Sequence, residues 1–242
     1  DVIELYEKKS KDEILAEIAK KYESNEEITL SDIEECYLQI GELKAAGKLF
    51  TPDTFEPMAD QLKAKTAGVV KALCLHIAHT CNLNCSYCFA SQGKYHGDRA
   101  VMSFETGKQA LDFLIANSGT RRNLEVDFFG GEPLMNFDVL KQTVYYAKEA
   151  GAKAGKKFLF TTTTNALLLN EETIRFFNEE MENVVLSLDG RKEVHDAIRK
   201  SVNGKGTFDL IIDKIKNFIS LRGDKSYYVR GTFTAKNLDF AK

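Results

Sequence analysis

Tryptophan is absent from this 242-residue sequence, and proline and methionine are scarce, with three and four residues. No apolar run approaches the ~18 residues that a membrane-spanning helix needs, so we expect no membrane segment. No signal peptide follows Asp1, and the missing initiator methionine suggests a piece of a longer gene product. With 43% hydrophobic and 29% charged residues, the composition is that of a globular protein, which excludes a disordered or fibrous one.

Five cysteines are present, and three of them, Cys81, Cys85 and Cys88, fall within eight residues. A secreted disulfide scaffold has an even number of cysteines, spread along a short chain. Clustered thiols in a longer chain are typical of metal ligands in a reducing compartment. The cysteine pattern therefore predicts a metal centre and a cytoplasmic location.

Charge divides the sequence into two predicted modules, residues 1–60 and residues 66–242. The first has 16 acidic and 7 basic residues, a net charge of −9, whereas the rest of the chain is +6. The junction is expected within residues 51–65, where Pro52 and Pro57 interrupt a segment of weak periodicity. The acidity of the first module argues against helix-turn-helix DNA binding, because phosphate contacts need lysine and arginine. We therefore expect no nucleic-acid partner.

The first module is predicted to be a small helical bundle. Ser10 with Glu13 and Ser31 with Glu34 are capping-box patterns, and each precedes apolar residues at helical spacing. Cys36 falls on the second apolar stripe, so we expect it to be a buried small hydrophobic residue.

The second module alternates predicted strands and helices. Short apolar or β-rich runs predict the strands, and apolar residues at helical spacing predict the helices between them. Such repeated units predict an α/β fold with a parallel sheet, as a barrel or partial barrel with its working groups at the carboxyl ends of the strands. The predicted strands are residues 69–78, 124–129, 157–163, 183–188 and 226–234, and the predicted helices are residues 104–117, 137–150, 171–181 and 207–221.

The strongest chemical signal is the CxxxCxxC spacing within residues 81–88, directly after the first predicted strand. Three thiolates in one loop can converge on one metal centre, and cysteine thiolates commonly hold iron–sulfur clusters. On a four-iron cluster, three protein ligands leave one iron open to a substrate or cofactor. A zinc site is the alternative, and Cys74, His76 or His79 would supply its fourth ligand. Cys74 is otherwise expected in the core of the first strand.

The cysteine motif, with the aromatic Tyr87 before its last cysteine, resembles the hallmark loop of the radical S-adenosylmethionine (SAM) enzymes. A second hallmark, FFGGEPLM, stands at the end of the second predicted strand. The resemblance implies a partial (β/α) barrel, a 4Fe–4S cluster on the three cysteines and SAM at the open iron, with Tyr87 among the SAM-binding residues.

In these enzymes the Gly-Gly-Glu-Pro segment, here Gly130, Gly131, Glu132 and Pro133, holds the methionyl ammonium group of SAM. An ammonium offers three donors and needs acceptors. Glycines let the backbone approach closely, Glu132 adds a negative charge, and Pro133 fixes the exit of the chain.

Polar side chains end the third and fourth predicted strands: Thr163 and Asn165 in TTTTNA, and Ser187 and Asp189 in SLDG. The resemblance implies that such groups meet the ribose hydroxyls or the methionyl carboxylate of SAM. The alternative is that Thr and Asn end strands for local hydrogen-bonding reasons.

Arg199 and Arg230 are the candidate partners of the SAM carboxylate, because a guanidinium suits that anion. Both could equally be ordinary surface or helix-end residues. His195 is expected to be structural, and His96, in a polar loop, receives no role.

Residues 70–240 are most similar to the SPASM-type peptide maturases, and within them to the SCIFF maturases. This resemblance implies thioether cross-links, from a cysteine sulfur to an acceptor-residue carbon, in a ribosomally made Cys-rich precursor peptide. It also implies a 5′-deoxyadenosyl radical and an electron donor of the flavodoxin or ferredoxin type. The first module resembles the helical half of a winged-helix-like domain that binds the leader of the precursor.

The resemblance further implies a sixth β/α unit and a carboxy-terminal domain with auxiliary 4Fe–4S clusters. The sequence ends at Lys242, after the fifth predicted strand, so we expect a C-terminally truncated barrel that binds its cluster but does not complete the cross-link. Two alternatives remain: a maturase of the anaerobic sulfatase type, and a zinc-binding peptide or nucleic-acid adaptor.

Overall fold

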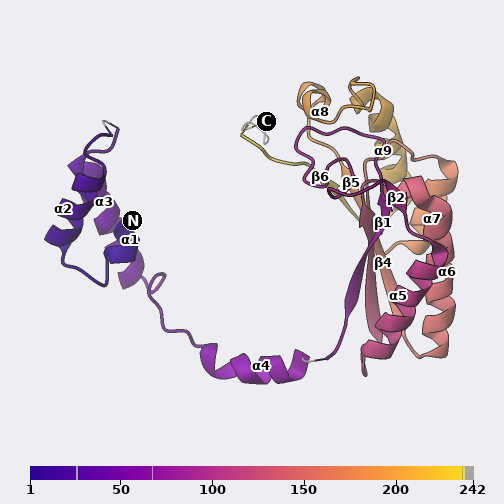
Figure 1. Cartoon of the computed structure of the whole chain (residues 1–242), viewed down its shortest axis with the longest axis horizontal. Helices are drawn as coiled ribbons and strands as arrows, with labels where there is room; N and C mark the ends of the chain where they lie inside the picture. The colour runs from indigo at the N-terminus through magenta and orange to yellow at the C-terminus, as the bar shows by residue number, and fades with distance from the viewer. Residues whose placement is uncertain (26, 67, 236, 238–242) are drawn as a thin grey trace. The chain divides into compact units, whose positions relative to one another are not determined.

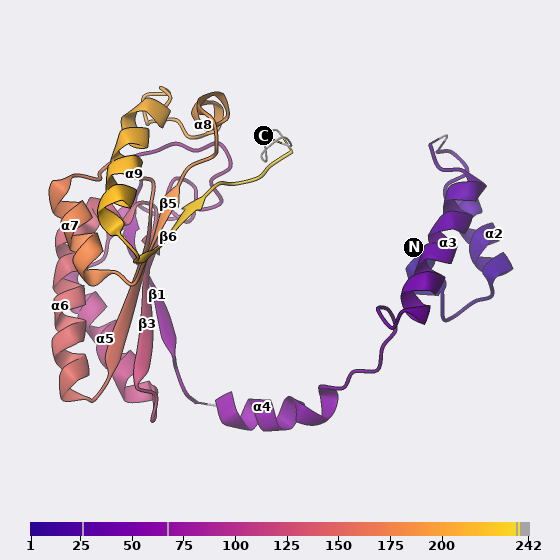
Figure 2. The ribbon, with the colours of Figure 1, turned by 180° about the vertical axis from the view of Figure 1, so that it is seen from behind.

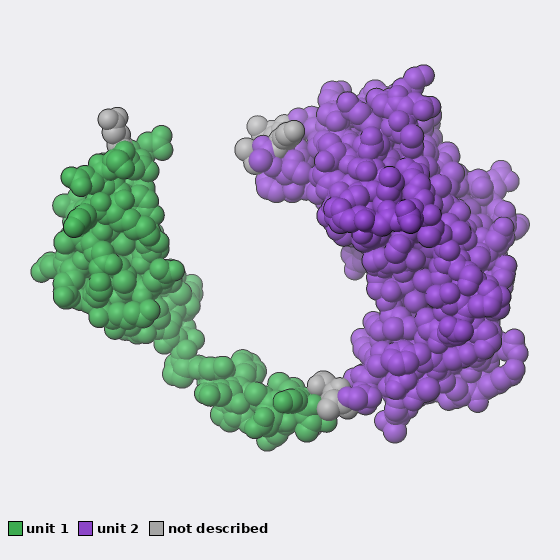
Figure 3. Space-filling model, viewed as in Figure 1, with its two compact units in different colours: residues 1–67 green, residues 68–242 purple. Residues whose placement is uncertain are grey.

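The computed structural model describes residues 1–25, 27–66, 68–235 and 237. The chain divides into two compact units, Asp1–Ala67 and Gly68–Lys242, which are coloured separately in Figure 3. Lys242, the expected cut end, lies outside the described residues. In the described ranges, no helix has both the length and the apolar character needed to cross a membrane.

Unit 1 is helical, and no strand occurs among its described residues. A 3-10 turn, η1 (Glu56–Met58), and the helix α4 (Ala59–Thr66) occupy the predicted junction, where the sequence pattern indicated no element. The three preceding helices are α1 (Val2–Leu5), α2 (Lys11–Lys21) and α3 (Leu30–Ala45), and their buried core consists of Val2, Ile14, Ile18, Ile33 and Ile40.

One of the two predicted capping boxes is confirmed. The hydroxyl of Ser10 accepts a hydrogen bond from the backbone of Glu13, and the Glu13 carboxylate accepts one from the backbone of Ser10. The second prediction is wrong, because the box that caps α3 is formed by Thr29 and Asp32. Ser31 lies inside the first turn of α3, where the backbone no longer has the extended conformation that a capping residue needs.

Unit 2 is built on a six-stranded sheet with the order β2-β1-β3-β4-β5-β6. Neighbouring strands from β1 to β6 are parallel, and β2 pairs with the outer edge of β1 in the antiparallel sense. The five predicted strands are confirmed with small differences at their ends, whereas β2 was not predicted. The strands are β1 (Ala72–His79), β2 (Ala100–Val101), β3 (Asn123–Gly130), β4 (Lys157–Thr164), β5 (Asn183–Ser187) and β6 (Ser226–Arg230).

The four predicted helices of unit 2 are confirmed, and they cover one face of the sheet (Figures 1 and 2). Alternate residues of the strands point at these helices and form the core, with Leu124, Val126 and Phe128 of β3 fully buried. An additional helix, α8 (Lys192–Ile198), follows β5 and was not predicted. The covering helices are α5 (Phe104–Asn117), α6 (Phe137–Lys153), α7 (Glu171–Glu180) and α9 (Phe208–Arg222).

Two cysteines expected in a core are exposed instead. Cys36 lies at the edge of the buried stripe of α3, and its side chain faces solvent. In β1, Leu75 and Ile77 point at the helices, so the alternation of the strand turns Cys74 to the opposite face. Within the described part of unit 2 that face carries no helices (Figure 1), and Cys74 is exposed.

Candidate functional site

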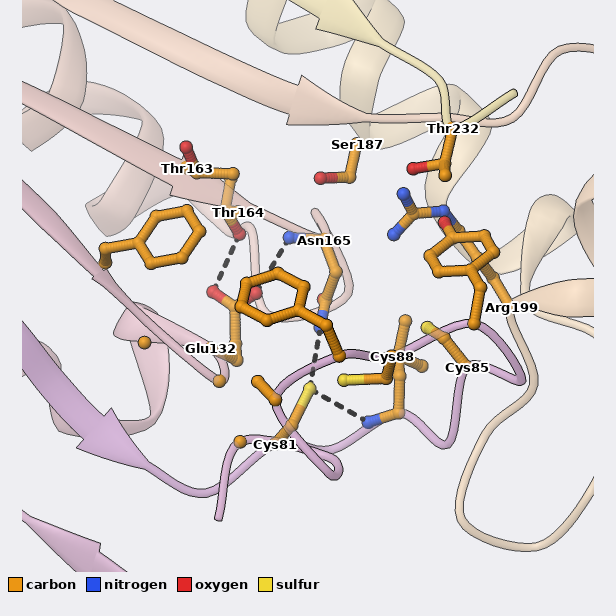
Figure 4. A pocket seen from close by; sticks show the side chains of 18 of the residues that line it. Cys81, Cys85, Cys88, Glu132, Thr163, Thr164, Asn165, Ser187, Arg199 and Thr232 are labelled. Atoms are coloured by element: carbon orange, nitrogen blue, oxygen red, sulfur yellow. Dashed lines mark hydrogen bonds between the residues drawn. The ribbon is translucent and has the colours of Figure 1, made fainter. Parts of the chain in front are cut away.

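A pocket lies at the carboxyl ends of the parallel strands (Figure 4). Segments far apart in the sequence meet there: the cysteine loop (residues 81–88), the turn after β3, the ends of β4, β5 and β6, and the residue that follows α8. Two predicted site residues, Pro133 and Asp189, do not line the pocket. The predicted residues that do line it are Cys81, Cys85, Tyr87, Cys88, Gly130, Gly131, Glu132, Thr163, Asn165, Ser187, Arg199 and Arg230.

The cysteine loop is attached to the segment that follows α8. The backbone N–H of Asn84 donates to the carbonyl of Lys200 at 2.7 Å, and that of Ser86 donates to the carbonyl of Ile198 at 3.1 Å. These bonds flank Arg199, which therefore enters the pocket directly beside the cysteines. The loop thus has a fixed position that depends on residues more than a hundred positions away in the sequence.

The three thiols differ in their surroundings. Cys81 is buried, and the backbone N–H of Leu83 donates to its sulfur at 3.4 Å, whereas Cys85 and Cys88 are half-buried. Burial raises the pKa of Cys81 to about 12. Burial also raises the pKa of Cys85, and the positive charge of Arg199 opposes that rise. Cys81 and Cys85 are therefore protonated at neutral pH unless a positively charged centre enters the pocket.

The arrangement does not fit the zinc alternative. Among the described residues, no three His, Cys, Asp or Glu side chains are grouped so that they could hold one metal ion. The three candidates for the fourth ligand, Cys74, His76 and His79, do not line the pocket. An iron–sulfur cluster makes a different demand, because each thiolate binds a different iron and the sulfurs need only surround a common space. Three cysteines that line one pocket satisfy that demand.

The glycine turn after β3 lies in backbone contact with the end of β1. The N–H of Gly131 donates to the carbonyl of Ala78 at 2.7 Å, and the N–H of Glu132 donates to the carbonyl of Thr80 at 3.0 Å. A Cβ atom on Gly131 would lie 2.1 Å from the Thr80 carbonyl oxygen, and one on Gly93 would lie 2.7 Å from the Gly131 Cα. Only glycine fits at these two positions, which join the strand end to the chain that follows the cysteine loop.

Glu132 is fully buried and is held by protein donors. Its Oε1 accepts hydrogen bonds from the Thr164 hydroxyl at 2.8 Å and the Leu134 N–H at 3.1 Å, and its Oε2 accepts one from the Asn165 N–H at 2.7 Å. Burial raises the pKa of Glu132 to about 7, and these hydrogen bonds oppose the rise. A carboxylate has about four lone-pair sites, so one acceptor position remains for a ligand.

Asn165 connects β4 to the cysteine loop. Its Nδ2 donates to the Asn82 side chain at 2.7 Å and lies 3.7 Å from the sulfur of Cys81. Its Oδ1 accepts from the N–H of Leu167 at 3.0 Å, so most of its hydrogen-bonding capacity is used within the protein. The amide of Asn82 has a buried Nδ2 without a partner, which is an unused donor beside the thiols.

Arg199 is buried in the pocket wall, with 7% of its surface exposed. Its Nε lies 3.0 Å from Oδ2 of Asp189 as an ion pair, although the alignment is too poor for a hydrogen bond. Its guanidinium carbon lies 5.4 Å from the centre of the Tyr87 ring, within cation–π range. Figure 4 shows the guanidinium group beside Ser187 and Thr232. This position suits recognition of an anion.

The remaining predicted residues have varied positions. Ser187 is buried at the end of β5, Thr163 is half-buried on β4, and Arg230 is exposed at the end of β6. Pro133 is the buried first residue of η2 (Pro133–Asn136), where a missing N–H costs nothing. Asp189 lies beneath the pocket with no surface exposed.

Several lining residues were missed from the sequence. Thr164 neighbours the predicted Thr163, but the alternation of β4 turns its hydroxyl to Glu132. Gly93 could have been found from the sequence, because it is the first glycine after the cysteine loop. Thr232 could be found only from the structure, which shows where the chain runs after β6. The residues that were missed are Leu83, Phe89, Ala90, Gly93, Phe129, Thr164 and Thr232.

Comparison with protein families gives one match, in which residues 75–232 fit the model described as the Radical SAM superfamily. An uncharacterized protein of Methanocaldococcus jannaschii is 31% identical over 172 residues, which cover 71% of this chain and 56% of that protein. The cysteine-type anaerobic sulfatase-maturating enzyme of Clostridium novyi is 34% identical over 143 residues, which cover 56% of this chain and 37% of that enzyme.

Among solved structures, the native anSMEcpe with bound AdoMet and Cp18Cys peptide has a similar fold, with a TM-score of 0.61 and 23% identity. The alignment covers 70% of this chain and 45% of that chain. The present chain therefore spans between 37% and 56% of the length of these three proteins.

Proposed function

Because the chain belongs to the radical SAM superfamily, we propose that its pocket holds a 4Fe–4S cluster and SAM, and that the protein modifies a ribosomally made peptide. Cys81, Cys85 and Cys88 would hold the cluster, since they line one pocket without converging on a single ion. When bound, the cluster and SAM supply a 5′-deoxyadenosyl radical that removes a hydrogen atom from the substrate. The observation that carries the proposal is the meeting of three thiols, a glycine turn and a buried guanidinium in one pocket.

The residues of the pocket have distinct proposed tasks toward SAM. Gly130 and Gly131 bring the turn against the end of β1 and so present Glu132 at the pocket, where its remaining lone pair accepts from the methionyl ammonium. Arg199 receives the carboxylate, because it is buried and already charge-balanced, whereas Arg230 is exposed at the rim. The hydroxyls of Ser187 and Thr163 serve the ribose, and Tyr87 packs beside the nucleotide. Asn165 holds the loop at Cys81.

For the substrate, we propose a Cys-rich precursor peptide in which thioether cross-links are formed, with an electron donor of the flavodoxin or ferredoxin type. The motifs that resemble the SCIFF maturases support this substrate class. Unit 1, with the acidic residues of the amino-terminal region, would bind the peptide leader, and auxiliary clusters would belong to a further domain. The second candidate, maturation of a sulfatase cysteine, is favoured by the 34% identity to the Clostridium novyi enzyme.

Anaerobic reconstitution with iron and sulfide tests the cofactor assignment. The chain should turn brown, bind iron and sulfide in cluster ratio, and cleave SAM when it is reduced. A variant with alanine at Cys81, Cys85 and Cys88 should lose the iron, whereas Cys36→Ala should keep it, because Cys36 is exposed in unit 1. A colourless chain that ignores SAM after reconstitution would contradict the assignment.

Mass spectrometry of candidate peptides then separates the two substrate classes. A thioether cross-link removes a pair of hydrogen atoms, blocks one cysteine from alkylation and yields linked fragments. A cysteine that is modified without linked fragments would favour the sulfatase-type reaction instead. Cross-linking that persists when the three pocket cysteines are replaced would refute both.

A further inference from the structure

We propose that Asp189 is a positioning residue, which orients Arg199 toward the methionyl carboxylate of SAM and holds Tyr87 beside the nucleotide, without contacting SAM itself. This inference rests on the proposed function and adds a role for a residue that the sequence placed among the direct SAM contacts. Asp189 and Glu132 are both fully buried, but only Glu132 lines the pocket. A ligand in the pocket is therefore separated from the Asp189 carboxylate by the residues that do line it.

The carboxylate of Asp189 joins three segments of the chain. Its Oδ2 accepts a hydrogen bond from the Tyr87 hydroxyl at 2.7 Å and lies 3.0 Å from Nε of Arg199. Its Oδ1 accepts from the backbone N–H of Thr232 at 2.9 Å. One buried charge thus connects the cysteine loop, the segment after α8 and the chain after β6.

The ion pair keeps Nε of the guanidinium on the side of Asp189, 3.0 Å from Oδ2 although without a hydrogen bond. Neither terminal nitrogen of Arg199 donates to another described residue. The terminal nitrogens form the fork that binds a carboxylate through two parallel hydrogen bonds. Asp189 also balances the charge of the buried Arg199, so the guanidinium is held beside its partner before any ligand arrives.

His195 provides a second connection between the same two residues. Its Nδ1 accepts from the backbone N–H of Asp189 at 3.3 Å, which leaves the proton on Nε2, directed at the Thr207 hydroxyl 3.1 Å away. That hydroxyl donates to the backbone carbonyl of Arg199 at 2.7 Å. The neutral, buried His195 therefore holds the backbones of Asp189 and Arg199 at a fixed separation.

The test compares two ligands that differ only at the carboxylate. The affinity of the reconstituted full chain is measured for SAM and for decarboxylated SAM, which keeps the sulfonium and ammonium groups. In D189N the affinity for SAM should fall about 10- to 100-fold, as expected for a weakened charge-assisted interaction. The affinity for decarboxylated SAM should change less than about twofold, because its recognition does not use the Arg199 fork.

Matched variants separate positioning from folding. D209N makes the same substitution at an exposed aspartate paired with Lys192, and it should change neither affinity. D189E keeps the charge and should restore part of the preference for SAM. In an R199K background, the addition of D189N should have little further effect, because both substitutions act on one interaction.

The other possible outcomes would overturn either the positioning role of Asp189 or the proposed function. Equal losses of affinity for both ligands, or no loss for either, would overturn the positioning role. Failure of both D189N and D189E to fold would also overturn it, since Asp189 would then serve the core rather than Arg199. If the unmodified chain binds neither ligand after reconstitution, the proposed function itself fails. If the unmodified chain binds SAM and D189N binds it equally well, only the positioning role of Asp189 fails.

Discussion

Replacement of Glu132 by glutamine should remove a pH-dependent loss of stability from unit 2. Glu132 is fully buried, and burial raises its pKa from 4.5 to about 7 although three hydrogen bonds stabilise the charged form. A group whose pKa is higher in the folded chain stabilises that chain at low pH, and this contribution is lost as the pH rises through the folded value. The gap between 4.5 and about 7 corresponds to about 3 kcal/mol of unfolding free energy.

Glutamine changes the balance in two ways. It does not ionise, so the loss between about pH 5 and pH 8 should be absent in E132Q. It also presents one oxygen and one NH₂ group where the carboxylate presents two oxygens, so the N–H of Leu134 or Asn165 loses its acceptor. That loss costs about 1–3 kcal/mol at every pH. E132Q should therefore be less stable than the unmodified chain at about pH 5, and the difference should shrink by about 3 kcal/mol by pH 8.

The measurement is the unfolding free energy of the cluster-free chain, obtained from urea titrations between about pH 5 and pH 8. Hydrogen exchange of the backbone amides in β3 and β4 reports the stability of unit 2 specifically. The difference between the two chains isolates Glu132, because other groups titrate in both. E149Q is the matched control, since the exposed Glu149 has its pKa lowered by Lys153 and contributes no loss in this window. A stability difference between E132Q and the unmodified chain that stays constant from pH 5 to 8 would refute the reasoning.

Two further substitutions test the local geometry. Gly131→Ala should destabilise unit 2 by several kcal/mol, roughly the cost of severe overpacking, because the new Cβ would meet the Thr80 carbonyl oxygen at 2.1 Å. Gly155→Ala, at a positive φ with open space around it, should cost only about 1 kcal/mol in the same urea titration, and equal effects would contradict the contact argument. Thr29→Ala should destabilise α3 by about 1 kcal/mol through loss of its cap. Ser31→Ala should change the stability by no more than about 0.5 kcal/mol, as measured by thermal unfolding. A larger loss for Ser31→Ala than for Thr29→Ala would show that Ser31 caps the helix.

Local patterns in the sequence were sufficient for five strands and four helices of unit 2, but not for β2 or α8. A short apolar run predicted β3, and its alternate residues Leu124, Val126 and Phe128 are buried. Apolar spacing predicted the four covering helices, because burial against one layer leaves a period in the sequence. The spacing of the cysteines and the glycine turn likewise pointed to one site at the strand ends. The same patterns failed at Cys36 and Cys74, which were expected to be buried but are exposed.

Only the tertiary structure decided what the buried polar groups of the site do. Asp189 and Glu132 stand in motifs that suggested direct contact with a ligand. In the structure, protein donors occupy most of the acceptor positions of the Glu132 carboxylate, and Asp189 is fully buried. The partners of Asp189, among them Tyr87 and Arg199, are set by chain segments that meet only when the sheet and the cysteine loop are in place. A sequence determines periodicity because that depends on near neighbours, whereas the partner of a buried charge depends on long-range contacts that no local spacing encodes.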